Sequence, residues 1–172
     1  MSTTENPIIL QTPRLILRQF ALIDTEFIIN LLNSPGWLQF IGNRNVRTED
    51  EARNYLLNGP LKSYRENGFG LALVELKSSE IPIGMCGLLK RDYLKVPDIG
   101  FAFLGDHIGM GYAFEIARAT LDHAREVYKI DHVMAITMPG NEASIRLLKK
   151  LGLKFSNTIS SPAGEELMVF GN

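Results

Sequence analysis

The sequence contains a single cysteine, Cys86, among its 172 residues. One cysteine excludes an intrachain disulfide framework and any zinc or iron–sulfur site built from several cysteines. Because Cys86 lies in an apolar, strand-like run, we expect a packed thiol in a reducing compartment. The three histidines are spread along the chain in no ligand pattern, so we expect no metal cofactor.

Neither sign of charge dominates, since 18 Lys and Arg residues face 19 Asp and Glu residues, for a formal net charge of −1. Such a chain gives no electrostatic reason to expect nucleic acid or an anionic membrane as a partner. No apolar run approaches the roughly 20 residues that span a bilayer. The segment Met1–Pro7 lacks the basic start and apolar core of a secretory signal. We therefore expect a cytoplasmic protein.

The length predicts one domain, 1–172, with residues 1–11 as a flexible N-terminus. Thr48 and Glu51 form a capping box, and Asn58 to Pro60 should end the helix that it starts. Periodicity predicts strands at 14–20, 70–76, 83–90, 98–104, 132–137, 153–158 and 166–170, and helices after Asp24, after Thr48, at 113–128 and at 142–151. This order is typical of a mixed α/β domain.

The segment Asp98–Ala113 leads from a predicted strand, through a loop with Gly109 and Gly111, into the most regular predicted helix. Glycines at such a junction let an anion approach the free N–H groups and the positive end of the helix dipole. A diphosphate cradle is one interpretation, and a tight turn before a helix is the other. The G-x-x-x-x-G-K-[ST] and G-x-G-x-x-G patterns are both absent, which makes ATP and NAD poor candidates.

Four blocks resemble, in order and spacing, the Gcn5-related N-acetyltransferase (GNAT) superfamily, in particular its ribosomal-protein-alanine acetyltransferase branch. They are TPRLILRQF from Thr12, IPIGMCGL from Ile81, DIGFAFLGDHIGMGYA from Asp98 and NEASIRLLKKLGLKF from Asn141. The resemblance implies an α/β acyl-CoA N-acyltransferase fold, with a mixed, strongly bent central sheet flanked by helices. In that fold the strand over 98–104 is bulged and splays from the strand over 132–137.

The resemblance further implies transfer of an acetyl group from acetyl-CoA, the co-substrate, to a primary amine by direct attack in a ternary complex. The acceptor would be a protein N-terminal α-amine or a small-molecule amine, and a homodimer is common in the family. The pantetheine arm would pair with backbone groups of Phe101, Ala102 and Phe103. The pyrophosphate would lie on the N–H groups of Ile108, Gly109, Met110, Gly111, Tyr112 and Ala113.

Three other residues are candidates with structural alternatives. Asn141 would face the pantetheine arm, and a helix N-cap is the alternative. Trp37 would line the acceptor pocket, and core packing is the alternative. Asp98 is the candidate general base, directly or through water, and a solvated aspartate at a strand end is the alternative.

The sequence departs from the family pattern at two positions. Leu148 stands where many members place the tyrosine that protonates the leaving thiolate, so Ser144 is the nearest replacement. A serine hydroxyl bonded within its own helical turn is the alternative. Asp106 stands where many members have Gln or Arg, and we expect it to point outward or cap the helix. Both departures leave open a non-catalytic acyl-CoA-binding or regulatory module.

Overall fold

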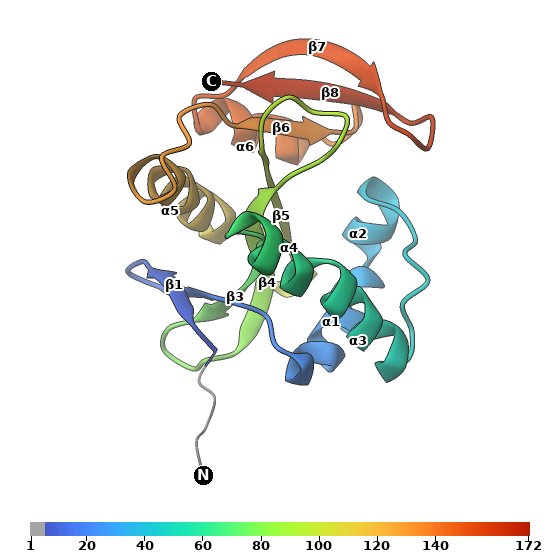
Figure 1. Ribbon diagram of the computed structural model, residues 1–172, viewed down its shortest axis with the longest axis vertical. Coiled ribbons are helices and arrows are strands. Elements are labelled where there is room, and N and C mark those ends of the chain that lie inside the picture. The colour runs from blue at the N-terminus through green and yellow to red at the C-terminus, as the bar shows by residue number, and fades with distance from the viewer. Residues whose placement is uncertain (1–5) are drawn as a thin grey trace.

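The computed structural model describes residues 6–172, which form one eight-stranded sheet with helices on both faces (Figure 1). The strands are β1 (Ile8–Gln11), β2 (Leu15–Arg18), β3 (Leu71–Leu76), β4 (Pro82–Leu89), β5 (Asp98–Phe103), β6 (Met134–Thr137), β7 (Lys154–Ser160) and β8 (Glu166–Gly171). The helices are α1 (Thr25–Leu32), α2 (Pro35–Phe40), α3 (Glu49–Asn58), α4 (Pro60–Asn67), α5 (Tyr112–Glu126) and α6 (Glu142–Lys150), with short 3-10 turns at Leu22–Asp24 and Gly105–His107. No helix among residues 6–172 is long and apolar enough to cross a membrane.

The sheet runs in the order β1-β2-β3-β4-β5-β6-β8-β7, and only β5 and β6 are parallel neighbours. These two strands share one register position, Asp98 with Met134, and the Met134 N–H donates to the Pro97 carbonyl at 2.9 Å. Beyond this position β6 stays paired with β8 as far as Thr137, while β5 stays paired with β4 as far as Phe103. The predicted splay between β5 and β6 is thereby confirmed.

The predicted bulge in β5 is wrong. β5 pairs with β4 from Asp98 to Phe103 without a register shift. The splay therefore arises because each strand stays with its outer neighbour, and no extra residue is needed to part them.

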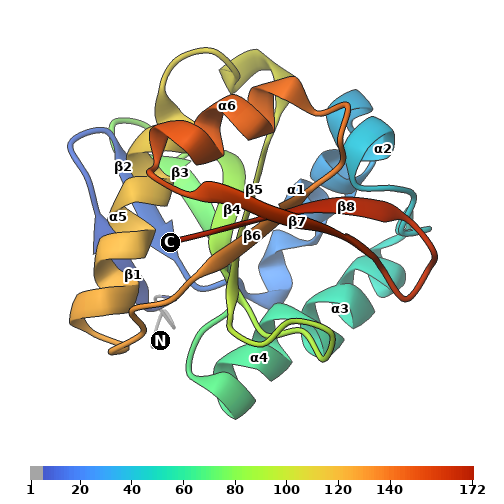
Figure 2. The ribbon, with the colours of Figure 1, turned by 90° about the horizontal axis from the view of Figure 1, so that it is seen from above.

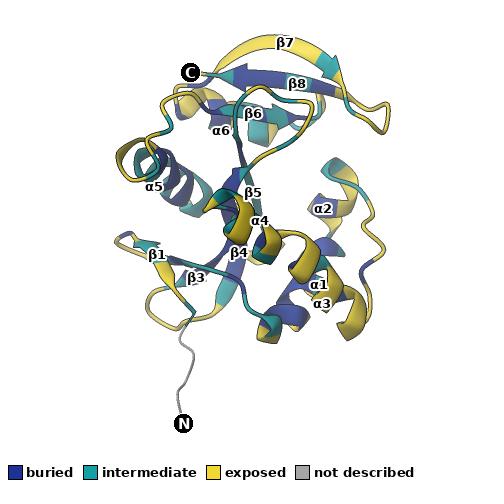
Figure 3. Cartoon of the chain, viewed as in Figure 1, coloured by how far each residue is buried: buried dark blue, intermediate teal, exposed yellow. Residues whose placement is uncertain are grey.

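Two hydrophobic cores lie on opposite faces of the sheet. Figure 2 shows α5 and α6 on one side of the strands and α1 and α3 on the other. One core joins the sheet to α5 and α6, and the other joins it to α1, α2 and α3. Figure 3 shows the buried strands between these layers and the exposed strand β7 at one edge of the sheet. Cys86 is fully buried, and burial raises the pKa of its thiol to about 12. The prediction of a packed thiol is confirmed.

Three elements differ from the sequence-based expectation. Residues Ile8–Gln11 form a strand paired with β2, where we expected a flexible N-terminus. Residues 1–5 lie outside the described part of the chain. α3 ends at Asn58, as the segment Asn58 to Pro60 predicted, but Pro60 also begins a new helix, α4, and Pro35 begins α2. Proline suits a first helical position because the N–H that it lacks has no partner within the helix there.

Candidate functional site

The loop between β5 and α5 leaves the start of the helix open. Gly109 and Gly111 have φ angles of +83° and +81°, in the left-handed region that glycine adopts without steric cost. Gly111 is the N-cap residue, and no side chain among residues 6–172 caps this helix. The N–H groups of Tyr112, Ala113 and Phe114 are therefore left without intrahelical partners. An anion at this point would meet several donors and the positive end of a 15-residue helix.

The side chains of the loop leave its backbone uncovered. Asp106, Ile108 and Met110 are all exposed. Asp106 makes no cap hydrogen bond to α5, so of the two expectations the outward position holds. Its charge is thus carried by a side chain that extends into solvent.

β5 has unpaired polar backbone groups on the side that faces β6. The Leu104 N–H donates to the Ile83 carbonyl of β4, whereas the Pro97 carbonyl accepts from β6. Because successive residues direct their backbone groups to opposite sides of a strand, Phe101 and Phe103 direct theirs toward β6. Ala102 directs its groups to β4, opposite Met85. The geometry thus supports Phe101 and Phe103 as pantetheine partners, and it does not support Ala102.

The start of α6 is closed by a side chain. Asn141 is its N-cap, and the Asn141 Oδ1 accepts a hydrogen bond from the Ser144 N–H at 3.2 Å. The N-cap alternative for Asn141 is confirmed. The half-buried Ser144 hydroxyl makes no hydrogen bond within residues 6–172, so it is not bonded within its own turn. Leu148 is buried in the core, where it contributes packing and no acid.

Asp98 is the most buried carboxylate near the strand splay, with 1% of its surface exposed. Both of its oxygens accept from the Arg91 Nε, at 3.0 and 3.1 Å. Burial raises the pKa of Asp98, and the Arg91 charge offsets only part of that increase. The alternative of a solvated aspartate is wrong. In this arrangement an amine cannot reach the carboxylate directly.

A groove of about 710 Å³ runs along α3, α4 and the end of β4. Leu89 lies in its wall and is the direct cross-strand partner of Asp98, so the two side chains share one face of the sheet. Tyr55 lies in the same wall; burial raises the pKa of Tyr55, and the nearby Arg91 charge lowers it. The groove therefore lies beside the Arg91–Asp98 pair. Its volume is typical of sites for small ligands.

Trp37 lies in the core between the sheet and α1 to α3, with 6% of its surface exposed. The core-packing alternative is confirmed. Its indole N–H has no hydrogen-bond partner within residues 6–172, although buried donors are usually satisfied. A role toward the acceptor stays a prediction.

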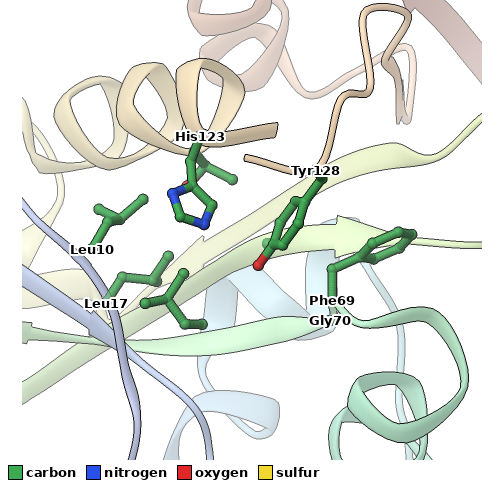
Figure 4. Close-up of a pocket in the computed structure, with 9 residues that line it drawn as sticks. Leu10, Leu17, Phe69, Gly70, His123 and Tyr128 are labelled. Atoms are coloured by element: carbon green, nitrogen blue, oxygen red, sulfur yellow. The ribbon is translucent and has the colours of Figure 1, made fainter. Parts of the chain in front are cut away.

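A second cavity, between β1, β2, β4, the segment before β3 and the last turns of α5, has a volume of about 20 Å³. Figure 4 shows His123 and Tyr128 beside Leu10 and Leu17 in its wall. The His123 and Tyr128 rings meet edge to face, with centroids 4.9 Å apart. A cavity of this size holds about one water molecule. It is too small for a coenzyme or an acceptor.

Arg14 is a residue of this site that the sequence reasoning missed. It precedes β2, yet its side chain reaches the loop before α5, where Nη1 donates to the Met110 carbonyl at 3.0 Å. Its Nε pairs with Glu115 in the first turn of α5 at 2.8 Å. The block TPRLILRQF contains this arginine, but only the tertiary arrangement reveals which segment it contacts.

Comparison with known proteins adds a family and a fold. A family model described as an acetyltransferase (GNAT) domain matches residues 14–154. A Bacillus subtilis protein, "Uncharacterized protein YkkB", is 33% identical over 156 residues, which is 87% of each chain. The crystal structure of an acetyltransferase from Agrobacterium tumefaciens superposes with a TM-score of 0.81 at 21% identity, covering 100% of this chain and 97% of that one. A structure of RimL, a ribosomal L7/L12 alpha-N-protein acetyltransferase in complex with coenzyme A, gives 0.80 at 16%, covering 96% and 97%.

Proposed function

Because this chain belongs to the acetyltransferase (GNAT) domain family, we propose that it transfers an acetyl group from acetyl-CoA to the α-amine of a peptide or protein N-terminus. Attack would be direct, within a ternary complex of the protein, acetyl-CoA and the amine. The observation that carries the proposal is the uncapped start of α5 next to the open side of β5. The helix start would supply main-chain donors for the diphosphate of coenzyme A, and the strand would supply main-chain groups for its amides. The amides and the diphosphate are the polar parts of coenzyme A nearest the thioester.

The residues of the loop and strand fit the coenzyme in distinct roles. The N–H groups from Gly109 to Ala113 would bind the diphosphate, with Gly109 and Gly111 leaving room for it, whereas the Ile108 N–H already donates to the Gly105 carbonyl at 3.3 Å. Phe101 and Phe103 would pair with the pantetheine amides as a neighbouring strand would. Of these two N–H groups, one that does not pair with a pantetheine carbonyl is the candidate for stabilising the oxyanion that forms as the amine attacks.

The proton balance favours an α-amine as acceptor. Deprotonation at pH 7 costs about 1.4 kcal/mol for an α-amine with a pKa of about 8, and about 4.6 kcal/mol for a lysine. Asp98 is the candidate base, and because of its burial it would act only through water. Ser144 is the candidate donor of a proton to the thiolate. Since a thiol has a pKa of about 8.5, water could also supply that proton.

The groove beside Asp98 suits a peptide better than a polyamine. Its charged side chains are Arg44, Lys62 and Lys90, against Glu51 and Glu66. The Glu51 Oε2 accepts from the N–H groups of Arg47 and Thr48, and Glu66 lies 4.0 Å from the Lys62 ammonium, so both carboxylates already have partners within the chain. The wall also contains four asparagines, Asn45, Asn54, Asn58 and Asn67, whose amides can both donate to and accept from a peptide backbone.

Thiol release from acetyl-CoA across a panel of amines tests the proposal. The panel contains peptides with free N-termini, the same peptides with blocked N-termini and an internal lysine, and spermidine. We expect release only with the free N-terminal peptides. Release with spermidine alone would contradict the proposed acceptor. Coenzyme binding without release from any amine would support a non-catalytic acyl-CoA-binding module.

A further inference from the structure

We propose that Arg14 is a positioning residue for the coenzyme loop, which holds the Met110–Gly111 backbone in its receptive shape and neutralises Glu115 beside it. The inference rests on the proposed function, because it concerns how this chain prepares its own loop for the diphosphate. Arg14 lies outside the loop in sequence, on the turn that leads into β2.

The Arg14 side chain is fixed by three separate contacts. Its Nε donates to the Glu115 Oε1 at 2.8 Å, and its Nη1 donates to the Met110 carbonyl at 3.0 Å. The guanidinium carbon lies 4.4 Å from the centroid of the Tyr112 ring, within the range of a cation–π interaction. One planar group therefore connects the loop to the first turn of α5.

The guanidinium also lies directly against Gly111. A Cβ atom at this position would stand 3.3 Å from the Arg14 Nη2, closer than most contacts of that kind. Nη2 makes no hydrogen bond with residues 6–172, although the other two nitrogens do. Its two N–H groups thus remain available next to the loop backbone that would receive the diphosphate.

Glu115 explains why a cation is needed here. A carboxylate in the first turn of α5 would repel a diphosphate bound at the same helix end. The Glu115 Oε2 accepts from the Thr12 hydroxyl at 2.6 Å and from the Arg14 N–H at 3.2 Å, and Oε1 takes the Arg14 Nε. Arg14 and Thr12 therefore hold this carboxylate toward the turn before β2 and offset its charge.

A lysine cannot reproduce this arrangement. Arginine presents a rigid fork of donors and a flat face, whereas lysine carries a single compact charge. A lysine at position 14 would keep the charge but could not hold Glu115 and Met110 while stacking on Tyr112. The positioning role thus predicts a different result for lysine than a purely electrostatic role does.

Calorimetric titration with coenzyme A tests the inference on five proteins: the wild type, R14Q, R14K, the double variant R14Q/E115Q, and the control R125Q. Arg125 pairs with Asp122 on the exposed face of α5, away from the loop.

We expect R14Q to weaken the affinity for coenzyme A by about tenfold or more, as for a lost charged hydrogen bond. R14K should recover only part of this loss, R14Q/E115Q should bind more tightly than R14Q, and R125Q should match the wild type. The KM of R14Q for acetyl-CoA should rise by a larger factor than its kcat falls.

Several outcomes would overturn the inference. A folded R14Q protein, checked by thermal unfolding, that binds coenzyme A as the wild type does would remove Arg14 from the site. Full recovery in R14K would leave only a charge effect and contradict positioning. A double variant no better than R14Q would contradict the role assigned to Glu115. A wild-type protein that does not bind coenzyme A would instead contradict the proposed function.

Discussion

The two ends of β5 are built in opposite ways. At its start, Asp98 is buried, paired with Arg91 and joined to β6. Beyond its end, the chain passes through exposed glycines to a helix that no described side chain caps. The first end depends on a buried pair of side chains, and the second depends on backbone groups, on the absence of side chains within the loop and on Arg14, which reaches the loop from outside. Coenzyme binding should therefore be sensitive above all to side chains added within the loop, whereas the start of β5 should be sensitive to side chains removed.

The largest effect is expected from Gly111→Asp, which would place a capping side chain at the start of α5. The new carboxylate would accept the first-turn N–H groups and place a negative charge where the diphosphate would bind. We expect at least about a hundredfold weaker Kd for coenzyme A, measured by calorimetry, because charged hydrogen bonds would be lost and repulsion added.

Gly164→Asp is the matched control for this experiment. Gly164 has a φ of +84° and open space around its Cβ position, in the turn between β7 and β8. The same substitution at the same backbone conformation should leave coenzyme affinity unchanged. If both variants bind coenzyme A as the wild type does, the start of α5 is not the diphosphate site.

Asp98→Asn, at the buried start of β5, should have the next largest effect. We expect turnover with a peptide amine to fall by about a hundredfold while coenzyme affinity is kept, as for loss of a general base. Burial raises the pKa of Asp98, so wild-type activity should fall as the pH decreases through that raised pKa. The variant should lose this limb of the pH profile.

Asp122→Asn serves as the control, since Asp122 pairs with Arg125 at the surface. An Asp98→Asn protein with wild-type turnover would remove Asp98 as the base. A lowered unfolding temperature with an unchanged pH profile would assign Asp98 to structure alone.

Asn141→Ala removes the cap of α6 and so makes its start resemble that of α5, which no described side chain caps. Loss of the side chain that caps α6 should lower the free energy of unfolding by about 1 kcal/mol, measured by urea denaturation. Thr48→Ala, which removes the cap of α3, should cost a similar amount. A selective loss of coenzyme affinity in Asn141→Ala, absent from Thr48→Ala, would show that Asn141 also faces the pantetheine arm.

The smallest effect is a pH dependence of stability at the first turn of α5. Burial raises the pKa of Glu115, but hydrogen bonds from Thr12 and Arg14 outweigh it and bring the pKa below the usual 4.5. The ionised group therefore adds stability above pH 4.5, and this contribution is lost as the pH falls through the lower folded-state pKa. The difference in Tm between the wild type and Glu115→Gln should shrink over that range. Glu142→Gln, at the exposed first turn of α6, should change Tm little at any pH.

Much of the fold could be predicted because the patterns are local. The apolar periodicity that predicted a helix at 113–128 matches α5, and the Thr48–Glu51 capping box is present. The short strand β1 was missed because four residues give little periodicity, and their pairing with β2 decides their structure. The helices α2 and α4 were missed because each begins at a proline, a residue that both ends one helix and suits the start of the next.

The candidate site could be predicted only where it consists of backbone. Gly109 and Gly111 indicate their role through the residue type itself, since glycine accepts a left-handed φ. The burial of Asp98 and its partner Arg91 depend on how the segment after β4 folds back, which no local pattern encodes. The same holds for Arg14, which lies 101 residues before its partner Glu115 in the sequence.

The single paired position between β5 and β6, Asp98 with Met134, has a mechanical consequence. The sheet consists of a five-stranded portion, β1 to β5, and a three-stranded portion, β6 to β8, which are joined at this pair and diverge from it. A molecule that hydrogen-bonds along the free side of β5 would lie between the two portions as an additional strand. Ligand occupancy should therefore stiffen the whole sheet, so that amide exchange slows in β6 and β8 as well as at the residues that touch the ligand.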